Sequence, residues 1–351
     1  MEQRRKQPAA LHCSSLDELM HGSTEPQAGS ETLMKRREFL RVGLAGATAL
    51  AVSPASLVGQ GTDLTGASSK IIDIHAHIIS SDVARYPIAP LEGMRSDWSR
   101  ERPVDFEKML SAMNQAGVDK AALVHSSTTY GYDCSYLADS VARQPKQVTG
   151  VFSVDMMATD AVDKIRYWAV EKKLGGLRLY TSGNTIEQQS TWMSDPKTFP
   201  GLECAQSLGL PVCVSMRTQG LPQLMVIVKR FPKIRFVIDH MIEPPIAEGM
   251  PYAGSQFLFD LAQYANVYLK LTTINIRASR AGKGSPETFF PLLVNRFGAS
   301  RIAWGSNYPA TEGTLKEMVA EAKSALNVLP VHDRDSIFAR TAQSLYPSLK
   351  D

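Results

Sequence analysis

Residues 71–77 read Ile-Ile-Asp-Ile-His-Ala-His, a short β-branched run that ends in two histidines. Seven similar runs follow along the chain, at 120–125, 148–155, 176–180, 211–216, 234–240, 266–272 and 301–306. Patterns with helical periodicity separate them, for example at 104–116, 161–173, 196–208, 221–230 and 314–326. Such alternation is typical of parallel strands joined by crossover helices.

These units predict a single α/β domain, a (β/α)8 TIM barrel, over residues 70–351. That segment is close to the length of about 250 residues typical of such barrels. Three helical patterns end at a glycine just before the next strand, at Gly117, Gly209 and Gly298. A doubly wound open sheet is the alternative. It is disfavoured because no G-x-G-x-x-G follows an early strand and polar residues gather at the strand ends.

The composition is that of a globular protein with a large core. The 351 residues are 44% apolar, and 38 Lys and Arg against 35 Asp and Glu give a net charge of +3. This balance excludes a disordered chain, and with no dense basic stripe we expect no nucleic-acid partner. The four cysteines lack the C-x-x-C spacing of a zinc or redox site, so we expect small buried side chains at Cys13, Cys134, Cys204 and Cys213.

The segment before the barrel, residues 1–69, predicts an N-terminal extension and an export signal. Lys35-Arg36-Arg37 opens a basic stretch, and residues 42–62 follow without a charge and contain Ala49-Leu50-Ala51, a candidate cleavage site. This arrangement resembles a twin-arginine signal and indicates a periplasmic or extracellular protein. The run is too rich in Ala, Gly and Ser for a stable membrane span. Met34 is a candidate natural start.

Polar residues at strand ends indicate the site, because TIM barrels build their active sites at the carboxyl ends of the strands. His75 and His77 are two residues apart on one strand, so both should point into the barrel mouth while Ile74 and Ala76 face the helices. Two imidazoles so placed can hold one divalent ion, although the pair alone is a weak signal. His240 ends the sixth run in the same way.

Three motifs together resemble the amidohydrolase superfamily, in particular its amidohydrolase-related branch. They are I-D-I-H-A-H at 72–77, V-I-D-H at 237–240 and W-G-S-N-Y-P at 304–309. That branch contains metal-dependent decarboxylases as well as lactonases such as the pyrone-dicarboxylate and sugar-lactone enzymes. The resemblance implies that His75 and His77 are metal ligands, that His240 is catalytic or close to a metal, and that position 307 is a catalytic acidic residue.

Two departures from the family pattern affect this expectation. Position 307 is Asn, and an amide cannot accept a proton near neutral pH. On the fifth strand, where many metal-dependent members carry a histidine, residues 214–216 read Val-Ser-Met. We therefore expect at most one weakly held divalent ion, Zn or Mn, with metal-free catalysis as the alternative.

Further candidates would contact the substrate. Arg178 should point with Tyr180 into the mouth, where it could grip a carboxylate or form a structural ion pair. Lys270 could be a second substrate cation or a structural partner of an aspartate in the barrel. His125, at the end of the second run, could contact substrate or simply pack.

The leading hypothesis is a hydrolase that opens a lactone or ester of a small carboxylated molecule, with His240 and Asn307 in the catalytic centre. A metal-dependent decarboxylase on the same scaffold is the first alternative. A non-catalytic barrel that binds a ligand or partner is the second, because position 307 is Asn. A homo-oligomer is compatible with the sequence.

Overall fold

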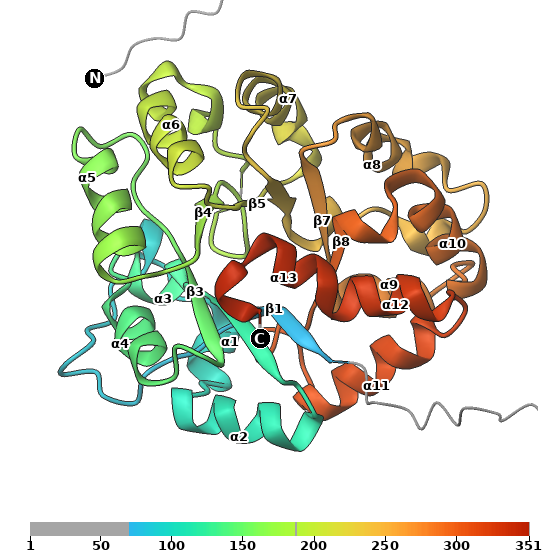
Figure 1. Cartoon of the computed structure of the whole chain (residues 1–351), viewed down its shortest axis with the longest axis horizontal. Coiled ribbons are helices and arrows are strands. Elements are labelled where there is room, and N and C mark those ends of the chain that lie inside the picture. Colours follow the sequence, from blue (N-terminus) through green and yellow to red (C-terminus); the bar gives the residue numbers. More distant parts are fainter. Residues whose placement is uncertain (1–69, 187, 351) are drawn as a thin grey trace, which may run out of the picture. The chain divides into compact units, whose positions relative to one another are not determined.

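The computed structural model describes residues 70–186 and 188–350, which form a TIM barrel (Figure 1). Its eight parallel strands follow one another around the sheet in chain order. They are β1 (Ile72–Ala76), β2 (Lys120–Val124), β3 (Val148–Phe152), β4 (Gly176–Tyr180), β5 (Val212–Ser215), β6 (Phe236–Ile238), β7 (Val267–Thr272) and β8 (Ile302–Gly305). The predicted fold class is confirmed. The predicted extension and export signal, residues 1–69, lie outside the described residues.

The helices surround the strands, as the alternating pattern predicts. They are α1 (Asp97–Glu101), α2 (Phe106–Ala116), α3 (Ser127–Tyr130), α4 (Ser135–Arg143), α5 (Ala161–Arg166), α6 (Phe199–Ser207), α7 (Leu221–Arg230), α8 (Gln256–Asp260), α9 (Thr273–Ala278), α10 (Pro286–Phe297), α11 (Leu315–Leu326), α12 (Val331–Asp335) and α13 (Thr341–Leu345). Gly117 and Gly298 follow α2 and α10 directly, with φ of 68° and 75°, a region that glycine enters without steric cost.

The first and last strands meet through residues just beyond β8. The Asp73 carboxylate accepts hydrogen bonds from the backbone N–H of His75 at 2.9 Å and of Ser306 at 2.8 Å. The His77 N–H donates to the Tyr308 carbonyl at 2.8 Å. A Cβ on Gly305 would lie 2.6 Å from the His75 Cβ, so only glycine permits this approach. This seam brings the histidine strand against the end of β8.

The barrel interior is apolar and closed at the end opposite to the carboxyl ends of the strands. A buried cluster draws on most of the strands and on the C-terminal segment: Ile72, Ile74, Ala122, Val124, Val151, Cys213, Val237, Ala303, Ala342, Leu345, Tyr346 and Leu349. Figure 1 looks onto this end, where α13 lies across the middle of the barrel. Side chains of the site can therefore reach solvent only from the carboxyl ends of the strands.

The orientation predicted for Ile74 is wrong, because it packs in this interior cluster and not against the helices. The register explains the difference. Asp73 pairs with Ala121 and Ala76 with Leu123, so β1 contains one extra residue, a β-bulge. A bulge breaks the strict alternation of faces. It lets Ile74 and the following His75 both point inward.

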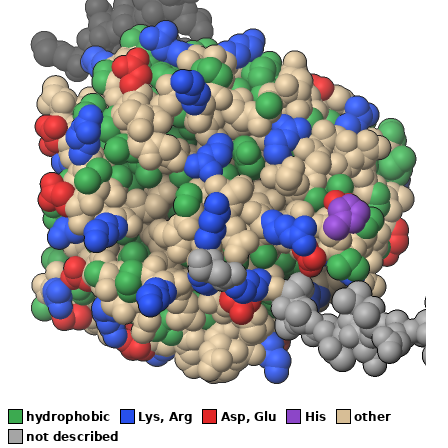
Figure 2. Space-filling view, viewed as in Figure 1, with side chains coloured by type: hydrophobic (Ala, Val, Ile, Leu, Met, Phe, Trp, Pro, Cys, Tyr) green, Lys and Arg blue, Asp and Glu red, His purple; other side chains and the backbone are tan. Residues whose placement is uncertain are grey.

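Three of the four cysteines, Cys134, Cys204 and Cys213, are buried and free, as predicted, and Cys13 lies outside the described residues. Lys and Arg side chains are spread among acidic and apolar ones over the face seen in Figure 2. Within residues 70–186 and 188–350, no helix has both the length and the apolar character needed to cross a membrane.

Candidate active site

A cavity of about 680 Å³ opens at the carboxyl ends of the strands. Six of the predicted site residues line it: His75, His77, Arg178, Tyr180, His240 and Asn307. Two do not. His125 and Lys270 are buried outside the cavity wall, 3% and 0% exposed. Most of the predicted residues therefore lie in one cavity. They come from β1, β4 and the segments that follow β6 and β8.

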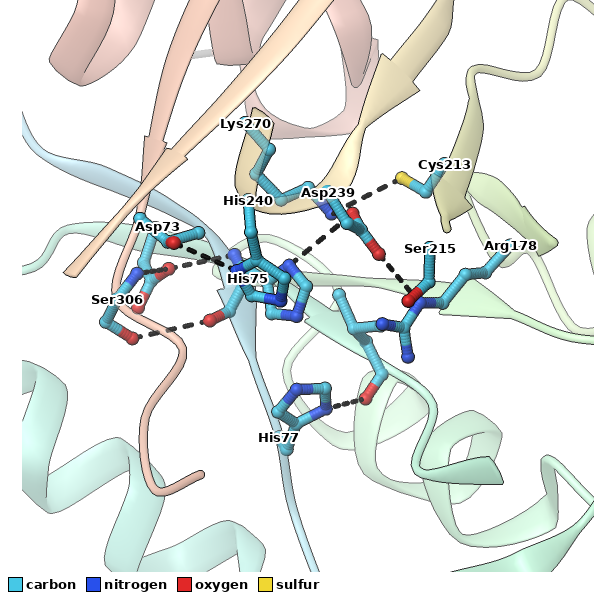
Figure 3. A network of polar contacts seen from close by, with 12 residues as sticks. Asp73, His75, His77, Arg178, Cys213, Ser215, Asp239, His240, Lys270 and Ser306 are labelled. Carbon is cyan, nitrogen blue, oxygen red and sulfur yellow. Dashed lines mark hydrogen bonds and ion pairs between the residues drawn. The ribbon is translucent and has the colours of Figure 1, made fainter. Parts of the chain in front are cut away.

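His75, in β1, and His77, just after it, differ in their bonding (Figure 3). His77 Nδ1 lies 2.9 Å from the carbonyl oxygen of Val124, which can only accept, so Nδ1 carries the proton and Nε2 is left as an acceptor. His75 Nδ1 lies 3.6 Å from Asp239 Oδ1, beyond hydrogen-bond distance, and neither ring nitrogen of His75 has a hydrogen-bond partner among the described residues. Its ring centroid lies 4.9 Å from that of His77 and 4.7 Å from that of His240. The three imidazoles therefore form one compact group.

All three imidazoles are neutral at neutral pH. Burial lowers the pKa of His75 well below 6.5, and the nearby Lys270 ammonium lowers it further. Burial and the Arg178 guanidinium lower the pKa of His77 to about 3. Burial also lowers the pKa of His240 to about 4, although Asp239 opposes this shift. Neutral imidazoles can accept protons from a reacting group.

Asp239 is the charged centre of the group. Burial would raise its pKa, but the Lys270 ammonium and the Arg178 guanidinium hold that pKa well below 3.8. Lys270 Nζ lies 2.8 Å from Oδ1, and Arg178 Nε donates to Oδ2 at 2.9 Å. Lys270 also contacts Cys213 Sγ at 3.4 Å. Lys270 is therefore an ion-pair partner of Asp239. Because Arg178 Nε is also bound to Asp239, only the two terminal nitrogens of Arg178 remain to bind a ligand.

The segment after β6 follows a left-handed path. His240, Met241, Ile242 and Glu243 have φ of 53°, 55°, 61° and 46°, a region that costs an ordinary residue roughly 1–2 kcal/mol. In an extended strand Asp239 and His240 would point to opposite faces. The left-handed turn brings both to the cavity. Such strain persists only where surrounding contacts hold it, and it is typical of functional sites.

Contacts from the start of α9 fix this turn and the His240 tautomer. Thr272 Oγ1 donates its one proton to Asn275 Oδ1 at 3.2 Å, so it can only accept from His240 Nδ1, which lies 2.9 Å away. Asn275 Nδ2 donates to the His240 carbonyl oxygen at 2.8 Å. His240 therefore carries its proton on Nδ1 and leaves the Nε2 lone pair for the cavity.

Asn307 stabilises the segment that follows β8. Its φ is 61°, a value that Asn and Asp adopt more readily than other side chains. Its backbone N–H donates to the His75 carbonyl at 2.6 Å, and its Nδ2 donates to Thr311 Oγ1 at 2.9 Å. The amide thus helps to hold β1 and the last loop together while it lines the cavity.

Three charged residues in the cavity wall were not among the predicted site residues: Arg217, Asp239 and Glu243. All three lie beyond the strand ends, where alternation gives no orientation. The same wall holds Trp98, whose ring lies 5.2 Å from that of His77 between centroids. Trp98 lies in α1, in the segment between β1 and α2.

The sequence profile of the amidohydrolase family matches residues 72–348. The chain belongs to the amidohydrolase family. The chain is also similar to L-fucono-1,5-lactonase of Burkholderia ambifaria, with 29% identity over 68% of this chain and 80% of the relative. The expected hydrolase of the amidohydrolase family is supported by both findings.

Two solved structures share the fold of this amidohydrolase. One, from Pseudomonas putida and assigned as a 2-pyrone-4,6-dicarboxylic acid hydrolase, has a TM-score of 0.65 and 20% identity, covering 81% of this chain and 99% of that one. The other is a dihydroxybenzoic acid decarboxylase of Polaromonas sp. with bound manganese. Its TM-score is 0.56 at 15% identity, covering 81% of this chain and 98% of that one.

The manganese in that relative raises the question of whether this amidohydrolase fits a divalent ion. Within residues 70–186 and 188–350, no three His, Cys, Asp or Glu side chains are arranged to hold one. Asp239, the carboxylate beside the imidazoles, is already paired with two cations. A divalent cation would meet their repulsion and find no free carboxylate among the imidazoles. The residues as arranged do not fit a tightly held ion.

Proposed function

We propose that this protein opens the ring of a lactone that carries a carboxylate, by adding water to the ester bond. One observation carries the proposal. His240 presents an unprotonated Nε2 to the cavity that the Arg178 guanidinium also lines, and Asp239, itself paired with Lys270, holds Arg178 in place. A proton acceptor beside a fixed cationic donor is what ester hydrolysis requires.

The residues suggest the order of events. His240 Nε2 takes a proton from water as the water oxygen attacks the carbonyl carbon. The terminal N–H groups of Arg178 donate to the carbonyl oxygen as negative charge develops there. The ring C–O bond then breaks, and the imidazolium returns its proton to the leaving ring oxygen. The product is an open-chain hydroxy acid.

The low pKa of His240, about 4, is compatible with this role. A free imidazole of that pKa is a weak base toward water. An anionic substrate beside the ring raises the pKa, because it favours the charged imidazolium. Substrate binding and proton acceptance are therefore coupled in this cavity.

A panel of carboxylated lactones tests the proposal, with ring opening followed by proton release. We expect turnover of at least one lactone, and we expect His240→Gln to lower kcat by about 10² to 10⁴, the usual contribution of a positioned base. His332→Gln is the matched control, because the His332 side chain is 74% exposed on α12. Its kcat should stay within twofold of the unaltered protein.

Other outcomes would point elsewhere. A large loss of kcat in Glu243→Gln with none in His240→Gln would make the carboxylate of Glu243 the base. Release of carbon dioxide from an aromatic acid would favour the decarboxylase alternative. Binding of lactones without any turnover would favour the non-catalytic barrel.

A further inference from the structure

Arg217 is the cation in the cavity wall that lacks an acidic partner. Its neighbours Arg178 and Lys270 are both paired with Asp239. Across residues 70–186 and 188–350, no carboxylate lies within ion-pair distance of Arg217. Glu243 lines the same cavity, but it does not pair with Arg217 either.

The Arg217 residue is exposed at the cavity, and one side-chain hydrogen bond orients its guanidinium. Its Nε donates to Ser182 Oγ at 2.8 Å, and Ser182 is 3% exposed in the loop after β4. Its backbone N–H donates to Gln189 Oε1 at 2.8 Å, and the Gln189 amide donates to Thr181 Oγ1 at 2.8 Å. With Nε occupied, the two terminal nitrogens of a planar guanidinium remain as donors.

Ser215 contributes to this arrangement from β5. Its Oγ donates to the Ser182 carbonyl oxygen at 2.8 Å, which locks the loop that carries the Ser182 hydroxyl. This is the fifth-strand segment at which many metal-dependent members of the family carry a histidine. Here Ser215 joins the end of β5 to the loop after β4 that orients Arg217.

We infer that Arg217 is the specificity-determining residue that binds the carboxylate of the substrate, and that Arg178, already compensated by Asp239, is left to the reacting carbonyl. The inference rests on the proposed lactone opening. An uncompensated and positioned guanidinium matches a carboxylate with two parallel hydrogen bonds. Arg217 lies in the loop after β5, and Ser182 lies in the loop after β4, whereas the histidines belong to the segments at the ends of β1 and β6.

A matched pair of substrates tests this role. 5-Oxotetrahydrofuran-2-carboxylate carries the anion, and its carboxamide is a neutral analogue of the same shape. Arg217→Gln should lower kcat/KM for the carboxylate by about tenfold or more, mainly through KM, and leave the carboxamide within twofold. Arg217→Lys keeps the positive charge but cannot form two parallel hydrogen bonds. Its kcat/KM for the carboxylate should therefore lie between that of the unaltered protein and that of Arg217→Gln. Arg296→Gln removes the same charge from the exposed face of α10, outside the cavity wall, and should change neither substrate.

Ser182→Ala gives a second, milder variant. It removes the hydroxyl that accepts from Arg217 Nε and should raise KM for the carboxylate alone, by a few-fold. Equal losses on both substrates, or no loss on the carboxylate in Arg217→Gln, would overturn the assignment. Failure of the proposed function looks different, since neither lactone would then be opened by any form. Calorimetric binding of 2-hydroxyglutarate, the ring-opened product, would still decide whether Arg217 binds the carboxylate.

Discussion

The side-chain amide of Asn275 donates a hydrogen bond to the backbone carbonyl of His240, at 2.8 Å. Asn275 lies in the first turn of α9, whereas His240 begins the left-handed turn after β6. This bond therefore joins two consecutive βα units at the point where the backbone is strained. Thr272, the residue that caps α9, adds the contact that sets the His240 tautomer.

The first prediction concerns that contact. Thr272→Val has the shape of threonine but cannot accept from His240 Nδ1, so the imidazole loses the partner that fixes its proton. We expect kcat to fall by about 10- to 100-fold, as for loss of one hydrogen bond of roughly 1–3 kcal/mol. Thr272→Ser keeps the hydroxyl and should lose no more than a few-fold. Similar kcat values for the two variants, measured on the same lactone, would argue against a role in orienting His240.

Much of the barrel could be predicted because β-branched runs and helical periodicity depend on local sequence. Strand alternation also predicts that Arg178 and Tyr180 point to the same side, and both line the cavity. The same rule explains the position of His125. Val124 points into the barrel, so the next side chain points away, and His125 Nε2 donates to the Gly131 carbonyl at 2.9 Å.

Features that depend on three-dimensional context could not be read in this way. The β-bulge in β1 and the left-handed turn at His240 arise from contacts with distant residues, Ser306 and Asn275. The depth of a side chain in the barrel is equally hidden. Lys270 points inward, but it lies two residues before the end of β7, where it meets Asp239 and Cys213 below the cavity. Arg217 lies beyond its strand, in a loop without periodicity.

A second prediction follows from the buried neutral histidines. Burial lowers the pKa of His77 to about 3 and that of His125 to about 4, against 6.5 when unfolded. Between pH 6.5 and about 4 the unfolded chain therefore binds more protons than the folded one. The free energy of unfolding should fall as pH decreases through this window, by up to about 1.4 kcal/mol per pH unit for each group.

Urea unfolding at pH 7, 6 and 5 measures this slope. His125→Gln keeps an amide that can donate to the Gly131 carbonyl but removes a titrating group, so its slope should be shallower than that of the unaltered protein. A free energy of unfolding that is flat from pH 7 to 5 would show that these imidazoles are not kept neutral by burial.

The third prediction concerns metal content. Because Asp239 is paired with Lys270 and Arg178, we expect at most one divalent ion per chain, lost readily on dialysis against a chelator. Lactone opening should survive that dialysis within twofold, and added zinc or manganese should not raise it. Elemental analysis before and after dialysis is the measurement. Two ions retained per chain would contradict the arrangement described for the histidines.

The last prediction concerns Asn307, because it separates an enzyme with a histidine base from a barrel that has lost its catalyst. Asp tolerates the left-handed backbone at this position, so Asn307→Asp should fold normally. If His240 is the base, the new carboxylate repels an anionic substrate. At an effective dielectric constant of about 20 and a separation near 10 Å, the repulsion costs about 1–2 kcal/mol, and kcat/KM should fall roughly tenfold.

The opposite result has a clear meaning. In a non-catalytic barrel, Asn307→Asp supplies the missing proton acceptor. The rate of hydrolysis should then be about 10² to 10⁴ times that of the unaltered protein. Asn307→Gly is the matched control, since glycine keeps the positive φ of 61° and removes only the side chain. With a histidine base, Asn307→Gly should retain more activity on a carboxylated lactone than Asn307→Asp, because it loses the hydrogen bond to Thr311 without gaining a charge. The ratio of kcat/KM between these two variants therefore measures the charge effect directly.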